Sequence, residues 1–285
     1  MPNIQNKNFK LYTDNQKKVL DLEKKYFNLL FKIFSQQSFS NEMRAIMNDI
    51  NKNWNRVHTI WGKENVVDLA VERHINFRIY NDPLIRKSIT SVYPSVISSD
   101  TAFVTNDAVI NIDSKTNNVS GNATDWTRQT IGCNQHSFDN KLNFYAQNKK
   151  VYVPVTNLLK PYHKSKPVLS FFLSTLYYSD KKNKIDSWYV DSKYKIKPYY
   201  DRNPKKKDKS IVRPEFLFNI KLSCMPHMEV SSLFDNNIID GTKSYIPPDD
   251  PNPIGTDAMR VTHDNLKERY DSNGRPWDGF KCWSI

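Results

Sequence analysis

The chain has 285 residues, the size of one large domain, and its Lys and Arg outnumber its Asp and Glu by 42 to 30, which favours a polyanionic partner, nucleic acid before membrane. Its seven glycines argue against glycine-rich phosphate loops, and its three scattered cysteines argue against a disulfide framework or a zinc site. Because we find no signal-peptide pattern and no apolar run long enough to span a bilayer, we expect a cytoplasmic protein with no membrane partner.

Three helices are predicted before the first strands. Apolar residues recur at helical spacing over residues 15–35 and again over 43–57, with Ser40 and Asn41 as cap residues of the second helix. A third helix is predicted over residues 64–80. A hairpin centred on Asn106 and Asp107 follows these helices along the chain.

Further strands follow a polar stretch at residues 116–140. They are predicted over residues 142–146, 150–155, 168–178, 187–190 and 216–224. A polar helix near residues 262–270 and a turn at 271–276 come last. No repeat or linker demands two domains, so we expect a single domain over 1–285, with N-terminal helices in 1–60, a catalytic core in 61–230 and a C-terminal extension in 231–285.

The hairpin carries an unusual arrangement of charged residues. Asp113 and Lys115 are two residues apart in the second apolar run, so both side chains project from the same face of a strand. Asp100 stands at the start of the first run and can lie near them if the runs pair. Two carboxylates and an ammonium then meet at one sheet edge, where they can hold a divalent metal against a phosphate, with the carbonyl of Ser114 as a further ligand.

The Asp-x-Lys tripeptide alone carries little information, since it also begins at Asp139, Asp180 and Asp191. Only at Asp113 does an acid open one apolar run and the tripeptide close the next. An ordinary surface hairpin with a salt bridge is the alternative. Asp107 is a substitute for the first acid, although a turn residue is the better interpretation of it.

These residues resemble the PD-(D/E)xK nuclease signature, with Ser99 in place of the proline, and this resemblance covers about residues 60–140. The helices before the hairpin, the later mixed strands and the chain length together resemble type II restriction endonucleases. The resemblance implies an α/β (α+β) fold with a mixed central β-sheet flanked by helices. It implies that Asp100 and Asp113 bind Mg²⁺ and that Lys115 activates water. It also suggests an acid from the preceding helix, for which Glu72 is the candidate, although an exposed helix glutamate is as good an interpretation.

The expected activity is Mg²⁺-dependent cleavage of specific double-stranded DNA that leaves 5′-phosphate ends. A homodimer is expected because a palindromic target matches a two-fold protein, and a cognate DNA methyltransferase is expected as a genetic partner. Two polar stretches, residues 116–140 and residues 193–213, are candidates for DNA contacts. The alternatives are a plain polar connection for the first and a solvated charged loop for the second. The candidates are Arg128, Gln129, Asn134, Gln135, Lys205, Lys206 and Lys207.

Two other functions remain open from the sequence. A structure-selective repair nuclease with the same motif would cut at junctions or ends rather than at fixed sequences. A DNA-binding protein without activity would carry the same hairpin as plain structure, and its binding would be sensitive to salt but not to EDTA.

Overall fold

The structure is a computed structural model. It describes residues 12–54, 56–57, 66–92, 100–118, 128–131, 144–146, 149–151, 162–179, 187–190, 196–199, 214–231, 233, 259–262 and 264–285. For some of these strands, among them 128–131, 187–190 and 196–199, the backbone alone is described.

The N-terminal helices follow the predicted periodicity closely. They are α1 (Asp14–Phe34), α2 (Gln37–Lys52), α4 (Val66–Asn81) and the short α5 (Pro83–Arg86). A capping box between Thr13 and Gln16 begins α1, because each side chain accepts a hydrogen bond from the other residue's backbone N–H. The predicted cap of α2 at Ser40 and Asn41 is wrong, since the helix begins one turn earlier and Ser40 is buried within it.

The central sheet has seven strands. They are β1 (Ser91–Val92), β2 (Thr101–Val104), β3 (Val109–Asn118), β7 (Tyr162–His163), β8 (Lys166–Ser179), β11 (Pro214–Met225) and β15 (Phe280–Ser284). Their order is β1-β2-β3-β8-β11-β15, with β7 paired to β8. Within this sheet β3 and β8 run parallel, and the other pairs are antiparallel. The sheet is therefore mixed, as predicted.

Short elements complete the described chain. Two-stranded pairs are formed by β4 (Arg128–Ile131) with β12 (Met259–Thr262), β5 (Phe144–Ala146) with β6 (Lys149–Val151), β9 (Ser187–Val190) with β10 (Ile196–Tyr199), and β13 (Arg269–Tyr270) with β14 (Pro276–Trp277). The remaining helices are α7 (Met228–Ser231) and α8 (Asp264–Lys267). The helix predicted near residues 262–270 is thus only one turn long, and β13 takes its second half.

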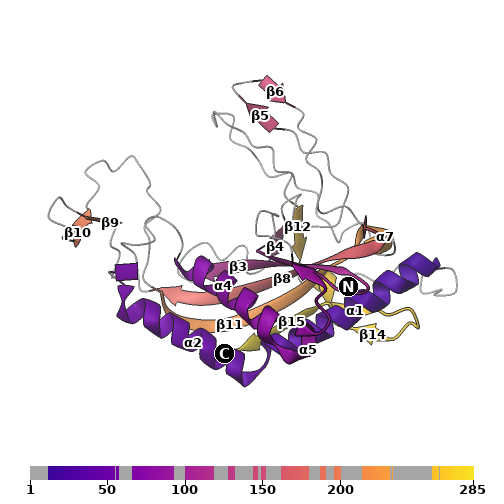
Figure 1. Cartoon of the computed structure of the whole chain (residues 1–285), viewed down its shortest axis with the longest axis horizontal. Helices are drawn as coiled ribbons and strands as arrows, with labels where there is room; N and C mark the ends of the chain where they lie inside the picture. Colours follow the sequence, from indigo (N-terminus) through magenta and orange to yellow (C-terminus); the bar gives the residue numbers. More distant parts are fainter. Residues whose placement is uncertain are drawn as a thin grey trace.

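The two faces of the sheet have different characters. Because side chains alternate along a strand, Ile110 and Ile112 of β3 point to one face, where they join Phe171 of β8 in the main hydrophobic cluster with α1, α2 and α4. Figure 1 shows these helices along one side of the sheet. Asp113 and Lys115 point to the opposite face, and the helices therefore support the sheet from behind that face.

The C-terminal segment is tied into this framework. Strand β15 pairs with β11 and forms one edge of the central sheet. Arg269 of β13 is fully buried and forms an ion pair with Glu23 of α1. Gly279 lies against this arginine, since a Cβ there would come within 2.5 Å of the Cδ of Arg269. The described part of the expected C-terminal extension thus packs on the core and extends its sheet.

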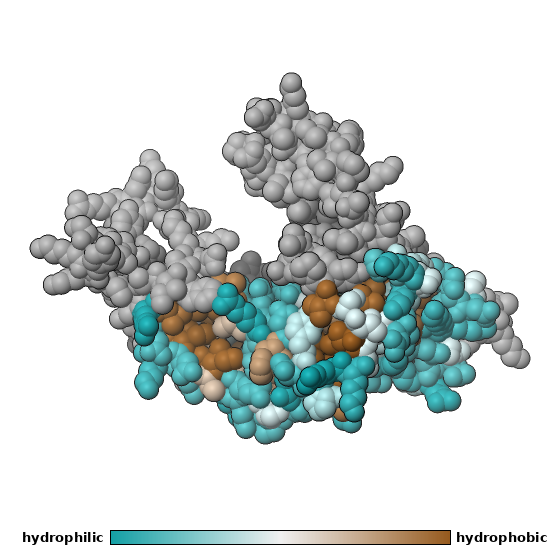
Figure 2. All heavy atoms as spheres, viewed as in Figure 1, coloured by the Kyte–Doolittle hydropathy of each residue, from teal (hydrophilic) through white to brown (hydrophobic). Residues whose placement is uncertain are grey.

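The helical face of the described residues is mainly polar. Figure 2 shows a largely hydrophilic helical face interrupted by smaller hydrophobic patches. Among the described residues, the exposed large hydrophobic side chains are Phe77, Leu84 and Val92. No helix in the described part of the chain combines the length and the apolar character that crossing a bilayer requires.

Candidate active site

The predicted hairpin is confirmed, and it brings its two acids together. Strands β2 and β3 are antiparallel with Thr101 opposite Ile112, so one further step of the same register sets Asp100 opposite Asp113. The Oδ2 atom of Asp100 accepts hydrogen bonds from the backbone N–H and the hydroxyl of Ser114, at 2.5 and 2.7 Å. The first acid is therefore fixed directly against the Asp-x-Lys tripeptide.

Asp113 and Lys115 form an ion pair on the predicted shared face. The Nζ atom of Lys115 lies 2.7 Å from Oδ2 of Asp113, whose side chain is 3% exposed whereas that of Lys115 is 35% exposed. Burial raises the pKa of Asp113 to about 7, and the negative charge of Asp100 adds to this while Lys115 opposes it. A carboxylate whose pKa is raised to about 7 is typical of a functional site.

Glu72 of α4 belongs to the same cluster of charges. Burial raises its pKa to about 7, and repulsion from Asp100, Asp68 and Asp113 contributes, while Lys115 lowers it. Glu72 is not an exposed, independent helix glutamate, because it is half-buried. Its charge also interacts with those of Asp100, Asp113 and Lys115, the three charged residues of the hairpin. The structure thus groups Glu72 with the set. Its role in the chemistry stays a prediction.

Asn76 fixes the start of the first strand, and the motif-based prediction does not include it. Its Nδ2 donates to the carbonyl of Asp100 at 3.2 Å, and its Oδ1 accepts from the Thr101 hydroxyl at 2.7 Å. Asn76 stands one helical turn after Glu72, so both residues lie on the same side of α4. That spacing is the signal by which the sequence indicates a polar helix face directed at the strand.

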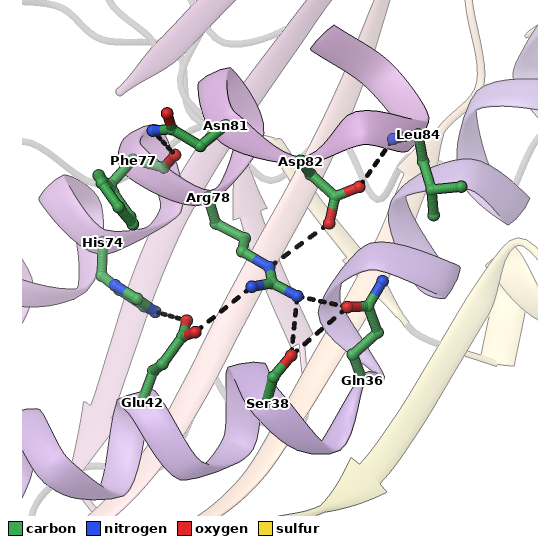
Figure 3. A network of polar contacts seen from close by, with 9 residues as sticks. All are labelled: Gln36, Ser38, Glu42, His74, Phe77, Arg78, Asn81, Asp82 and Leu84. Atoms are coloured by element: carbon green, nitrogen blue, oxygen red, sulfur yellow. Dashed lines mark hydrogen bonds and ion pairs between the residues drawn. The ribbon is translucent and has the colours of Figure 1, made fainter.

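A polar network positions α4 against α2. Arg78 of α4 donates to Ser38 at 2.9 Å and pairs with Glu42 at 3.3 Å, and it also contacts Gln36 and Asp82 (Figure 3). Glu42 in turn lies 3.0 Å from Nε2 of His74, one turn before Arg78. The helix that carries Glu72 and Asn76 is therefore held in place from the side opposite the strands.

The donor set fits a hard divalent cation. Mg²⁺ prefers oxygen ligands and is commonly held by one or two carboxylates together with water and substrate phosphate. Asp100 and Asp113 supply two carboxylates, and Ser114 directly follows Asp113 and donates to Asp100. Among the described residues no group of three or more His, Cys, Asp or Glu is arranged as a metal site.

The remaining candidates lie elsewhere. Asp107 is in the turn at the far end of the hairpin, where Lys25 lies 2.5 Å from Oδ2 and the Tyr26 hydroxyl 2.5 Å from Oδ1, so it serves the turn and not the acid pair. Arg128 and Gln129 lie on β4, paired with β12, where the backbone alone is described. Outside the described residues are Asn134, Gln135, Lys205, Lys206, Lys207, Asp139, Asp180 and Asp191.

Comparisons with known proteins identify the family of the chain. Residues 15–183 match the family described as "Type II restriction enzyme MwoI, N-terminal domain". That match covers more than half of the chain, including Glu72 and the whole hairpin, and the protein therefore belongs to this family of type II restriction enzymes.

A solved structure supports the fold. The chain is similar to the restriction endonuclease BglI, described as bound to its DNA recognition sequence, with 15% identity, a TM-score of 0.50 and coverage of 91% of this chain and 90% of that one. A tetrameric restriction endonuclease, SfiI, bound to cognate DNA, gives 13% identity over 96% of this chain and 89% of the other, at a TM-score of 0.44. A search of curated proteins gave no match.

Proposed function

We propose that the protein is a site-specific deoxyribonuclease that uses Mg²⁺ to hydrolyse phosphodiester bonds of double-stranded DNA and leaves 5′-phosphate and 3′-hydroxyl ends. The observation that carries the proposal is the contact of Asp100 with Ser114 beside the ion pair of Asp113 and Lys115. Membership of a type II restriction enzyme family and the net charge of +12 support it.

Each residue of the site has a distinct role in this proposal. Asp100, Asp113 and the carbonyl of Ser114 would hold the Mg²⁺, which when bound neutralises charge on the scissile phosphate and lowers the pKa of water. Lys115, whose ammonium lies beside Asp113 and is partly exposed, orients the attacking water and stabilises the charge that develops on phosphorus. Asn76 holds Asp100 in position by donating a hydrogen bond to the backbone carbonyl of Asp100.

Glu72 takes the position of an additional acid. Its raised pKa, about 7, places its titration near the pH at which a general base works best. We therefore assign it either to a further contact with the cation or to proton transfer from water. These two roles differ in their effect on Mg²⁺ affinity, which only the first would change.

The proposed partner is duplex DNA, cut by a homodimer at a palindromic site. BglI, whose fold this chain shares, is described as bound to its DNA recognition sequence. Arg128 and Gln129 remain proposed contacts to bases or phosphates, together with Asn134, Gln135 and Lys205–Lys207. A DNA methyltransferase encoded nearby would protect the host genome from such an enzyme.

Digestion of phage DNA with Mg²⁺ tests the proposal. The wild type should give discrete fragments that a DNA ligase rejoins without prior phosphorylation, because the ends carry 5′-phosphates. Asp100→Asn, Asp113→Asn and Lys115→Met should each lower the rate on the order of 10²–10³-fold or more. Asp107→Asn is the matched control from the other end of the same hairpin, and it should keep the wild-type pattern.

Three results would contradict parts of the proposal. Fragments that survive Asp113→Asn and Lys115→Met would place the chemistry elsewhere. A smear without fixed sites would favour a structure-selective nuclease. Salt-sensitive DNA binding without cleavage under any divalent metal would leave a DNA-binding protein.

A further inference from the structure

A cleft of about 430 Å³ opens between the edge strand β1 and the tip of the β7–β8 hairpin. Its lining consists of Thr90, Ser91, Val104, His163, Lys164 and Lys166. None of these six residues is acidic, and three carry a basic side chain. The cleft thus combines a partly apolar floor with basic side chains and no acid in its lining, and this charge favours an anion.

The cleft lies on the same face of the sheet as the candidate active site. Val104 of β2, Val109 of β3 and Val168 of β8 are direct neighbours in the strand register and form a small cluster under the cleft. Val109 and Asp113 are four residues apart in β3, so their side chains point to the same face. At a rise of about 3.3 Å per residue, the floor of the cleft is about 13 Å from Asp113 along the strand.

The hairpin that supplies the lysines has an unusual backbone. Lys164 and Ser165 form its two-residue turn with positive φ values of 47° and 65°. Hairpin turns of this kind favour glycine or asparagine at such positions, and other residues there carry a conformational cost. A two-residue turn of this type requires positive φ at both positions, and as a result Lys164 stands at the exposed tip of the hairpin.

Lys166 is held at the cleft rather than extended into solvent. Its Nζ donates to the carbonyl of Thr105 at 2.5 Å, across the end of β3. An ammonium has three N–H donors, so this bond orients the group and leaves donors for a ligand. Lys164 is exposed at the turn, and Ser91 is exposed on the opposite wall.

We propose that this cleft binds a backbone phosphate of the DNA duplex whose scissile phosphate lies at Asp100 and Asp113. A duplex offers phosphates at short intervals along each strand and across grooves about 12 Å wide, so a second phosphate within about 13 Å of the first is available. The inference rests on the proposed nuclease function and adds to it a contact that fixes the duplex without reading its sequence.

Binding of DNA at several salt concentrations, in EDTA so that metal-dependent cutting stops, tests this proposal. Lys164→Gln/Lys166→Gln should flatten the plot of log K against log salt by about 0.9 for each phosphate that the variant no longer neutralises, and should weaken binding on the order of 10-fold at 0.1 M salt. With Mg²⁺, KM for DNA should rise while kcat stays unchanged. Lys164→Gln alone, which changes an exposed side chain at the turn, should show the same effects at smaller size.

Lys32→Gln/Lys52→Gln is the matched control, because both lysines are exposed on the helices behind the opposite face. It should leave the salt slope unchanged. An equal decrease of the slope in this control would mean that only total charge matters and would overturn the proposal, as would a wild-type slope in both cleft variants. A raised Tm with inorganic phosphate, absent from the cleft variant while the DNA slope is unchanged, would assign the cleft to free phosphate and overturn it too.

The outcomes for the nuclease function are separate. If the wild type cleaves DNA and the cleft variants bind DNA as the wild type does, only the proposal that the cleft binds a phosphate is contradicted. A wild type that never cleaves contradicts the nuclease function, and the salt slopes in EDTA still decide whether the cleft takes a backbone phosphate.

Discussion

Glu23 and Asp113 are both buried carboxylates, but their surroundings differ. Glu23 pairs with the guanidinium of Arg269 and accepts from the backbone N–H of His227 at 2.7 Å. Arg269 also donates to the carbonyl of Cys224 at 3.0 Å and stacks 4.7 Å from the centre of the Trp277 ring. Burial raises the pKa of Glu23, and the guanidinium and the N–H oppose that effect.

Asp113 stands among other acids. One lysine, 35% exposed, opposes the effect of burial on its pKa, while Asp100 adds negative charge. Glu72 adds a third carboxylate to the same region. The difference is that the fold gives Glu23 a fully buried guanidinium as its counter-charge, whereas Asp113 has a partly exposed ammonium and further carboxylates nearby, a pattern typical of functional sites.

The largest effect is expected from breaking the Glu23–Arg269 pair. Glu23→Gln leaves a fully buried guanidinium without its counter-charge, and it should lower the free energy of unfolding by about 3–5 kcal/mol. Urea denaturation measures this decrease. Asp278→Asn is the control, since Asp278 is 53% exposed in its pair with Lys281 and should cost about 1 kcal/mol or less. Equal decreases in the two variants would show that the buried pair is no more important than a surface one.

Asp113→Asn should raise the free energy of unfolding instead of lowering it. The pKa of Asp113 is raised to about 7 in the folded protein, so its ionised form costs stability, and this cost appears as pH rises from about 4 to about 7. The shift of about three pKa units, at about 1.4 kcal/mol for each unit, should make the variant more stable than the wild type by about 4 kcal/mol at pH 8 without divalent metal. The gain should disappear near pH 4, where Asp113 is protonated in the folded state.

Urea denaturation at both pH values, in EDTA, measures this difference. The variant should combine higher stability with abolished cleavage, as expected where a site is arranged for function at the expense of stability. A variant that is less stable than the wild type at pH 8 would mean that Asp113 is well compensated, like Glu23, and the contrast between the two carboxylates would fail.

The sequence predicts the hairpin of the candidate site better than it predicts the framework around it. The Asn106-Asp107 turn and the two apolar runs define the hairpin, and the two-residue period of a strand then places Asp113 beside Lys115. These are local relations. The contacts of Asn76 with Asp100 and Thr101 depend on the packing of α4 on β2. In the sequence, only the spacing of Asn76 from Glu72 indicates that it faces the strand.

The Glu23–Arg269 pair has no local signal at all. Its members are 246 residues apart, and their pairing depends on β15 closing the edge of the sheet beside β11. The polar periodicity near residues 262–270 predicts a helix, but tertiary pairing takes Arg269 and Tyr270 into β13. Helix propensity is a weak preference that such packing overrides.

The smallest expected effect concerns the pH dependence of Mg²⁺ binding. A cation competes with a proton for the carboxylate of Asp113, and with a pKa of about 7 this group is about one-tenth ionised at pH 6 and about nine-tenths at pH 8. Mg²⁺ should therefore bind about 10-fold more tightly at pH 8, a difference of about 1.4 kcal/mol. The rise in Tm with added Mg²⁺ measures this affinity without DNA or cleavage. Asp107→Asn should keep the pH dependence, and Asp113→Asn should lose it.

The same measurement on a Glu72 variant separates the two roles proposed for this residue, because the pKa of Glu72 is also raised to about 7. If Glu72 contacts the cation, two protons are displaced and the change in affinity from pH 6 to pH 8 exceeds 10-fold, and Glu72→Gln returns it to about 10-fold. If Glu72 only transfers protons, Glu72→Gln lowers kcat and leaves the pH dependence of Mg²⁺ binding as in the wild type. An affinity that is equal at both pH values would show that the carboxylate of Asp113 is already fully ionised at pH 6, and would make Asp113 as well balanced as Glu23.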